Sequence, residues 1–357
     1  MKASDNNPNT NAVPAGISDD QLTEAVRQSG YPLQTIVASE LKEQFGIQEE
    51  WSYIDRDSGD LRALDIYARR SLYRIEGPQP RVRPHIVMLI ECKRSDLPFI
   101  FFKTAGNVWL KEFPLVAGLK EPHVRLTSET DPSMWYLPVI TCLNLQQHRF
   151  VSSPPALCTT YSKVVRGGKD LQLSGSEAYG SVVLPLVKAM QYFAKTASPL
   201  ATHRYFDCYA TVGICVLDAP MVVAESPSDV PQLTLMPWVR LIRDEAKKDR
   251  TGFETSVKYA LDFVHRDHLR TYIRDWLLPF SQDFGQRVMK HDLVLAECAG
   301  FVPGMWDAGF EHIEANMRPV GVTEKVTRAG LITTRMAKLP RYLLTKVRNG
   351  LFAKRRQ

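Results

Sequence analysis

A short apolar run without alternation limits what this chain can fold into. The segment Pro84-His-Ile-Val-Met-Leu-Ile90 has no regular exchange of apolar and polar residues, which is typical of a central strand covered on both faces. Glu91, Cys92 and Lys93 follow directly. Because side chains alternate along a strand, Glu91 and Lys93 share one face and Cys92 lies on the other. Buried charges are costly unless they are paired or bind a metal. The simpler alternative is a surface ion pair worth under about 1 kcal/mol.

The composition is typical of a globular protein. Of the 357 residues, 44% are hydrophobic and 24% are charged, which is enough for one large or two modest domains. No run of about 18 apolar residues occurs, and the first residues lack the apolar centre of a signal peptide. We therefore expect a soluble, cytoplasmic protein. Six scattered cysteines without a CxxC pair predict reduced, buried thiols and no structural zinc.

The net charge of +6 is distributed unevenly. Residues 318–357 hold eleven Lys and Arg against one Glu, whereas residues 1–317 hold 34 basic and 38 acidic residues. A basic tail of this kind favours a polyanion, either nucleic acid or an anionic membrane surface. Within it, residues 341–352 have the spacing of an amphipathic helix, which would dock equally well on its own domain. At the other end, residues 1–16 are rich in Asn, Asp, Ser and Pro and are predicted to be disordered.

The hydrophobic patterns predict a mixed α/β fold whose central sheet is flanked by helices. The expected elements are helices over 33–45, 182–195 and 268–277, and strands over 49–55, 61–70, 85–93, 209–217, 233–243 and 259–264. The turn Asp57-Ser58-Gly59-Asp60 predicts that the first two strands form an antiparallel hairpin. Residues 95–178 carry short apolar runs and many Pro and aromatic residues, and we interpret them as a long insertion of small strands and helices.

Two acidic residues fall where these patterns call for apolar ones. Glu40 lies in the middle of the apolar stripe of the first helix, together with Leu33, Val37 and Leu41. Asp65 interrupts the apolar run of the second strand. A Glu40 side chain that extends past its neighbours to water is the alternative interpretation.

Together these residues resemble the motif of the PD-(D/E)xK nuclease superfamily, which has the restriction-endonuclease-like fold. The resemblance rests on Glu40, Asp65, Glu91-x-Lys93 and Gln191, in the order helix, three strands, helix, strand. It covers roughly residues 33–93 and 180–218, and Leu64 stands where the motif has Pro. It implies a nuclease-like domain over 17–317 with the insertion at about 95–178, followed by a helical C-terminal extension and the basic tail.

Hydrolysis of a phosphodiester gives these residues a chemical role. Mg²⁺ or Mn²⁺ prefers oxygen ligands, so Asp65 and Glu91 are expected to hold the ion, with the Cys92 carbonyl and Glu40 as further metal ligands. Lys93 is expected to position the attacking water and to stabilise negative charge. Gln191 would orient water or a carboxylate, although an amide at the helix surface is an equally good interpretation.

These expectations define a leading hypothesis and its alternatives. The leading hypothesis is a metal-dependent DNA endonuclease or exonuclease. The alternative is a catalytically inactive nuclease-like module that binds nucleic acid or a protein partner. A homodimer and a membrane-surface contact through the basic tail are further partner hypotheses. The sequence does not distinguish DNA from RNA or one strand form from another.

Overall fold

The computed structural model describes residues 2–74, 77, 79–104, 110, 112–129, 135–226, 230–248, 254–304 and 309–321. The amphipathic stretch at 341–352, and the basic tail from residue 322 onward, lie outside these residues. Among the described helices, none combines the length and the apolar character needed to cross a membrane.

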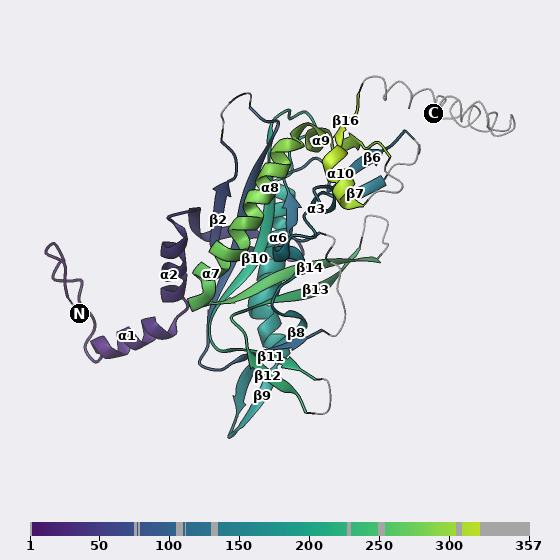
Figure 1. Cartoon of the computed structure of the whole chain (residues 1–357). Coiled ribbons are helices and arrows are strands. Elements are labelled where there is room, and N and C mark those ends of the chain that lie inside the picture. The colour runs from purple at the N-terminus through teal and green to yellow at the C-terminus, as the bar shows by residue number, and fades with distance from the viewer. Residues whose placement is uncertain are drawn as a thin grey trace, which may run out of the picture.

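One mixed sheet of twelve strands organises the chain (Figure 1). Its strands, in spatial order, are β1 (Gly46–Ile54), β2 (Leu61–Ser71), β3 (Val82–Arg94), β10 (Phe206–Asp218), β14 (Glu254–His265), β13 (Trp238–Lys248), β8 (Leu157–Gly167), β4 (Phe99–Lys103), β11 (Met221–Glu225) and β12 (Gln232–Leu235), with β5 (Leu115–Ala117) beside β10 and β9 (Asp170–Ser174) beside β8. Strands β1, β2 and β3 are antiparallel neighbours, whereas β3, β10 and β14 run parallel. The predicted hairpin and the mixed α/β class are confirmed.

Helices cover both faces of the sheet around β3. The helices are α1 (Asp19–Gln28), α2 (Tyr31–Leu41), α3 (Val139–Cys142), α4 (Arg149–Ser152), α5 (Gly175–Ala178), α6 (Leu184–Thr196), α7 (Leu269–Tyr272), α8 (Leu278–Lys290), α9 (Asp292–Glu297) and α10 (Phe310–Asn316), with single π-helical turns at Tyr179–Val183 and Ile273–Leu277 and a 3₁₀ turn at Arg266–His268. Val87 and Leu89 pack in the core that α6 covers, and Ile86, Met88 and Ile90 pack in the core that α2 and α8 cover. The unalternating run is therefore a central strand, as predicted.

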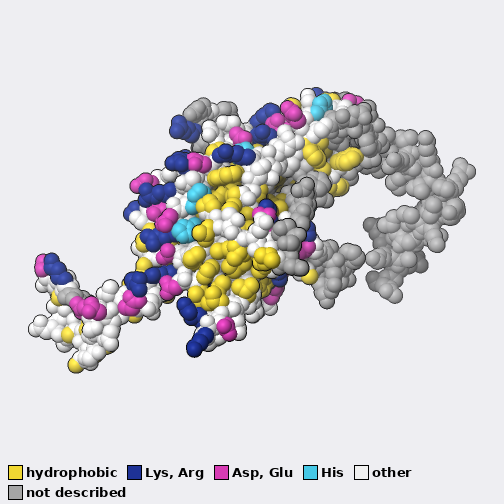
Figure 2. Space-filling view, turned by 60° about the horizontal axis from the view of Figure 1, so that its bottom comes forward, with side chains coloured by type: hydrophobic (Ala, Val, Ile, Leu, Met, Phe, Trp, Pro, Cys, Tyr) yellow, Lys and Arg dark blue, Asp and Glu magenta, His cyan; other side chains and the backbone are white. Residues whose placement is uncertain are grey.

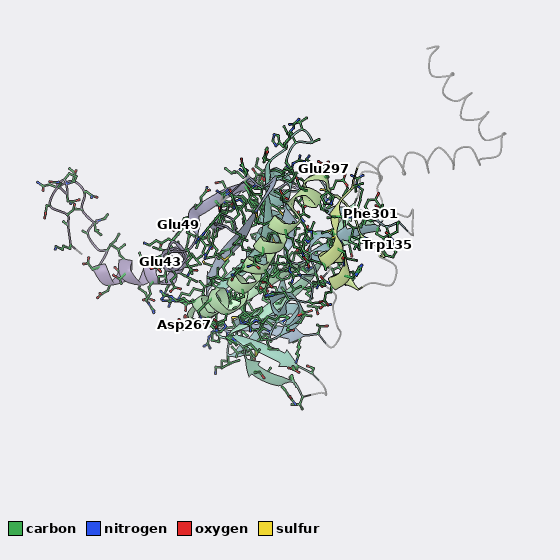
Figure 3. The ribbon with its side chains drawn as sticks, turned by 45° about the horizontal axis from the view of Figure 1, so that its top comes forward. Glu43, Glu49, Trp135, Asp267, Glu297 and Phe301 are labelled. Atoms are coloured by element: carbon green, nitrogen blue, oxygen red, sulfur yellow. The ribbon has the colours of Figure 1, made fainter. Side chains whose placement is uncertain are left out.

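A second, small sheet lies beside the main one. Its order is β16 (Arg318–Pro319), β15 (Ala299–Phe301), β6 (His123–Thr127) and β7 (Trp135–Pro138). Figure 3 shows Trp135 and Phe301 of this sheet on the opposite side of the molecule from Glu43 and Glu49. The small sheet is thus remote from the end of the main sheet that carries α2 and β1.

Several predicted boundaries were wrong, for physical reasons that the structure makes clear. Helix α2 ends at Leu41, and Gly46 begins β1. The strand expected over 233–243 is two strands separated by Met236 and Pro237, because proline has no N–H for the ladder. The segment 95–178 contains strands and helices, as predicted, and its strands β4, β8 and β9 extend the main sheet.

The cysteines are buried, whereas several large apolar side chains of the outer strands are exposed. All six cysteines are free and buried, as predicted. By contrast, Leu171, Leu173, Leu233 and Leu235 of the outer strands β9 and β12 are exposed. Figure 2, which brings the end with β9, β11 and β12 forward, shows hydrophobic side chains gathered on this face. In the described part of the chain, helices therefore cover the sheet near β3, whereas hydrophobic side chains of its far edge are exposed.

Candidate functional site

The candidate site lies where β2 and β3 separate. Their pairing ends at Ile66 and Ile90. Beyond this point β2 stays paired with β1 as far as Leu61, and β3 stays paired with β10 as far as Arg94. The two strands therefore form a fork, in which backbone groups that face each other lose their ladder partners. We call this place the β2–β3 fork.

Asp65 closes the fork with its side chain. Its Oδ2 accepts a hydrogen bond of 2.6 Å from the backbone N–H of Cys92, which would otherwise lack a strand partner. The side chains of β2 also change face here, because Leu64 packs in the core under α6 and Ile66 packs in the core under α8. This change of face turns Asp65 toward β3 instead of into either core.

Glu91 and Lys93 project from one face of β3, as the sequence predicts. Lys93 Nζ lies 2.6 Å from Glu91 Oε1. Glu91 is 6% exposed, whereas the Lys93 side chain is 33% exposed and reaches the surface. The pair is therefore partly buried, unlike the surface ion pair of the simpler interpretation.

The electrostatics of the fork are unbalanced, with two carboxylates near one ammonium. Burial, and then the negative charge of Asp65, raise the pKa of Glu91 to about 7, although Lys93 opposes the rise. Burial also raises the pKa of Asp65 against the Cys92 N–H and the charge of Lys93. Burial by itself lowers the pKa of Lys93, but the carboxylates Glu91 and Asp65 outweigh burial and raise it. Lys93 therefore remains a cation.

Cys92 contributes its backbone and not its thiol. The thiol packs in the core under α2 and α8, and burial raises its pKa well above the usual value. Within a strand, the N–H and C=O of one residue point to the same neighbour. Because the Cys92 N–H points to Asp65, the Cys92 carbonyl also faces β2. This carbonyl was predicted to be a metal ligand.

Glu40 does not join the fork residues. Its Oε2 lies 3.4 Å from Nε of Arg270 on α7, and the buried residues of α2 include Gln34, Val37 and Ala38 in place of Glu40. The packing of α2 turns Glu40 to the edge of the buried stripe, where its side chain is 23% exposed. The prediction of Glu40 at the centre of the stripe needs this correction.

Gln191 also has another partner. It lies on α6, as predicted, and is hydrogen-bonded to the hydroxyl group of Tyr259 on β14. The Gln191 amide is therefore engaged at β14, which lies two strands away from β3 in the sheet. A role of Gln191 in orienting water stays a prediction.

Two residues near the fork were not identified from the sequence. Gln34 of α2 donates a hydrogen bond of 3.1 Å to the Asp65 carbonyl. Glu50 stands opposite Asp65 in the β1–β2 register, has a φ of +50°, and adds a negative charge that raises the pKa of both Asp65 and Glu91. The predicted turn at 57–60 does not give this register, because it would place Arg56 opposite Leu61, whereas Ile54 pairs with Leu61. Gln34 is recognisable only by its helical spacing with Ala38 and Leu41.

The donor set determines which metal ion the fork can take. Within the described parts of the chain, no three or more His, Cys, Asp and Glu side chains gather in a group able to hold a metal ion. The expected convergence of Glu40, Asp65 and Glu91 is thus not met. Asp65, Glu91 and the Cys92 carbonyl still fit Mg²⁺, which is usually held by one or two carboxylates and keeps several waters. The raised pKa of Glu91 also fits a metal site, because a bound cation would relieve the repulsion between the Asp65 and Glu91 carboxylates.

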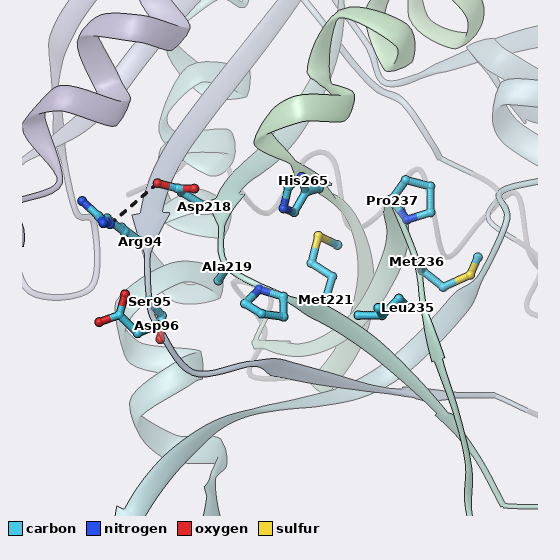
Figure 4. Close-up of a pocket in the computed structure, with 11 residues that line it drawn as sticks. Arg94, Ser95, Asp96, Asp218, Ala219, Met221, Leu235, Met236, Pro237 and His265 are labelled. Atoms are coloured by element: carbon cyan, nitrogen blue, oxygen red, sulfur yellow. Dashed lines mark ion pairs between the residues drawn. The ribbon is translucent and has the colours of Figure 1, made fainter.

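A cavity of about 690 Å³ begins one residue beyond Lys93. It lies at the carboxyl ends of three parallel strands, and Arg94, Asp218 and His265 contribute to its wall (Figure 4). Arg94 Nε lies 3.7 Å from Asp218 Oδ2. Met221 and Met236 form part of an apolar wall. Such crevices at the ends of parallel strands commonly bind ligands in α/β proteins.

We compared the chain with protein-family models, curated proteins and solved structures, and none of them matches. The function proposed below therefore rests on the geometry of the β2–β3 fork and on the residues that resemble the nuclease motif.

Proposed function

We propose that this protein is a metal-dependent nuclease that hydrolyses phosphodiester bonds of DNA. The observation that carries the proposal is the β2–β3 fork, where Asp65, Glu91 and Lys93 meet with one carboxylate more than the single ammonium can balance. Perturbed pKa values from burial and a specific charged neighbour are typical of functional sites. The cytoplasmic location expected from the sequence stays a prediction.

The order of elements supports the same proposal. Helix α2, strands β1 to β3, helix α6 and strand β10 follow one another, interrupted by the segment between β3 and α6. This is the order of helix, three strands, helix and strand on which the resemblance to PD-(D/E)xK nucleases rests. In it, the three fork residues occupy the second and third strands, as the motif requires.

Each fork residue has a role that its surroundings permit. Asp65, Glu91 and the Cys92 carbonyl would hold a Mg²⁺ or Mn²⁺ ion. When bound, such an ion neutralises charge on the phosphoryl oxygens and favours ionised water. Lys93 stays protonated, so it cannot accept the proton of the attacking water. Its ammonium instead positions that water and stabilises negative charge on the phosphate, from a side chain that reaches the surface.

The test uses the full chain and its single variants. Purified protein is incubated with single-stranded DNA, duplex DNA and RNA, in Mg²⁺, in Mn²⁺ and in EDTA. We expect cleavage only with metal, and its loss in Asp65→Ala and Glu91→Ala. Glu297→Ala is the control, because this exposed carboxylate on α9 pairs with Arg81, which precedes β3 at the opposite end from the fork. Full cleavage by both fork variants would refute the assignment of the site.

A binding module without turnover is the second candidate. Two observations favour it: Glu40 is engaged by Arg270, and the described residues hold no group of three metal-ligating side chains. This candidate predicts DNA binding that EDTA and Glu91→Ala leave unchanged, and no Mn²⁺-dependent rise in the melting temperature. A rise in wild type that Glu91→Ala abolishes would favour the nuclease.

A further inference from the structure

A second cavity, of about 650 Å³, lies at the opposite end of β2 from the fork. It is bounded by the chain at the end of β2 and by the start of α8. Helix α8 approaches this chain closely because residue 285 is glycine: a Cβ there would lie 2.9 Å from the Cβ of Leu72 and 3.0 Å from its carbonyl oxygen. Close packing of α8 therefore fixes the wall of the cavity.

Among the described residues, the charged side chains that line the cavity are all arginines. Arg70, Arg74 and Arg274 contribute three guanidinium groups, and no described Asp or Glu side chain lines it. Arg70 contacts only a neutral partner, with Nη1 at 3.3 Å from Gln44 Oε1. Arg274 pairs with its neighbour Asp275, but its side chain is 72% exposed, so this pair contributes little. The positive charge of the cavity remains available to a ligand.

Neutral donors complete the lining. The amides of Gln282 and Gln286 and the hydroxyl of Ser71 face the same cavity. Guanidinium groups bind phosphate oxygens through two parallel N–H bonds, whereas a lone carboxylate would leave some of three guanidinium groups unmatched. The volume falls in the range of about 300–1,000 Å³ that is usual for small-ligand sites. The chemistry of the lining therefore fits a phosphate group.

A chain of polar groups that includes the buried His85 holds Ser71 in the cavity wall. Ser71 Oγ lies 3.3 Å from His85 Nδ1, and His85 Nε2 lies 3.3 Å from Asp207 Oδ1. His85 is buried between the rings of Tyr73 and Tyr209. Asp207 also pairs with Arg83 at 2.6 Å and accepts a hydrogen bond from Tyr209 at 3.0 Å, which fixes its carboxylate. The Ser71 hydroxyl is thus oriented by groups that do not themselves line the cavity.

We propose that this cavity binds a ligand through its phosphate group, held by Arg70, Arg74 and Arg274. The cavity is distinct from the β2–β3 fork, because Ser71 lies six positions along β2 from Asp65, a span of about 20 Å. The phosphate belongs either to a small phosphorylated molecule or to the 5′ end of a nucleic-acid strand. The second source rests on the proposed nuclease function, whereas the first does not.

The experiment measures binding by the full chain in EDTA, so that cleavage plays no part. The probes are orthophosphate, pyrophosphate, a nucleoside 5′-monophosphate, and one oligonucleotide with and without a 5′-phosphate. Calorimetry and thermal shift are recorded for wild type, Arg74→Ala, Arg274→Ala and the control Arg166→Ala, an exposed arginine on β8. We expect each cavity variant to bind at least about tenfold more weakly, since a charged hydrogen bond is lost, and the control to bind like wild type.

The outcomes separate the two sources and the two proposals. A monophosphate that binds as tightly as the phosphorylated oligonucleotide identifies a small ligand. Tighter binding of the phosphorylated oligonucleotide than of its unphosphorylated form, lost in Arg74→Ala, identifies a strand end. No binding of any phosphate probe, or equal binding by wild type and both cavity variants, overturns the proposal. Because binding is measured in EDTA and without turnover, a failed nuclease assay does not affect this result.

Discussion

The main sheet buries charge in two places, and the two differ in how the charge is balanced. On β13 and β14, Arg240 and Asp262 are fully buried and form two parallel contacts of 2.7 and 2.8 Å. Arg240 also donates to the Phe150 carbonyl at 2.6 Å, and Tyr272 donates to Asp262 at 2.7 Å. At the β2–β3 fork, in contrast, Asp65 and Glu91 share the single ammonium of Lys93.

This contrast shows that buried charge alone does not mark a site. In the Arg240–Asp262 pair each charge meets its opposite and the remaining polar atoms find partners, which is what a buried ion pair needs in order to persist. The guanidinium also lies 3.7 Å from the centre of the Phe113 ring. At the fork the negative charge is in excess and Lys93 reaches the surface. Surplus charge with access to solvent, rather than depth, distinguishes the candidate site.

The largest effect is expected from breaking the balanced pair. Asp262→Ala leaves the Arg240 guanidinium buried without its partner, which should lower the free energy of unfolding by about 3–5 kcal/mol. Urea denaturation measures the loss. The control is Asp244→Ala, which removes an exposed partner of Lys258 and should cost under about 1 kcal/mol. Similar losses in both variants would remove the distinction between the two kinds of pair.

The fork variants should show the opposite pattern, with activity lost and the fold retained. For Asp65→Ala and Glu91→Ala we expect initial cleavage rates at least about a hundredfold lower, which is the usual consequence of removing a charge-stabilising group at a reaction centre. The folded fraction of Asp262→Ala, studied at low temperature, should cleave at the wild-type rate. Slower cleavage by that fraction would show that the Arg240–Asp262 pair also supports the fork.

A pH series tests the surplus negative charge directly. Glu91 has a pKa of about 7 in the folded protein against an ordinary value of 4.5, so the folded state holds its proton more tightly. The stability that this protonation contributes is complete below pH 4.5 and is lost as the pH rises through about 7, at up to about 1.4 kcal/mol per pH unit. Subtracting the unfolding free energy of Glu91→Gln, measured without metal over this range, isolates the slope. Parallel curves for the two proteins would contradict the raised pKa.

The smallest effect is expected at Glu40. Its ion pair with the largely exposed Arg270 should contribute under about 1 kcal/mol, and Glu40→Gln should cleave DNA at nearly the wild-type rate. Initial rates over a Mg²⁺ titration check this expectation. A weaker metal dependence in Glu40→Gln would show that Glu40 contributes to the metal site and that α2 helps to form it.

Part of the site was predictable because strand geometry is local. The period of two along β3 placed Glu91 and Lys93 on one face, and the turn residues at 57–60 predicted that β1 and β2 form an antiparallel hairpin. The orientation of Glu40 was not predictable in the same way. Each residue turns a helix by 100°, so Gln34 and Glu40 point about 120° apart, and the rotation of α2 against the sheet decides which of them contacts β2.

The sequence by itself determined a central strand with charges at its end, a preceding hairpin, and helices on both faces, because apolar periodicity and turn residues act over a few positions. Only the tertiary structure decided how the charges are partnered. Asp65 closes a fork by accepting from Cys92, Arg270 engages Glu40 from 230 positions away, and Arg240 finds Asp262 across a strand pair. These contacts depend on register, helix rotation and the packing of distant segments, which no local pattern encodes.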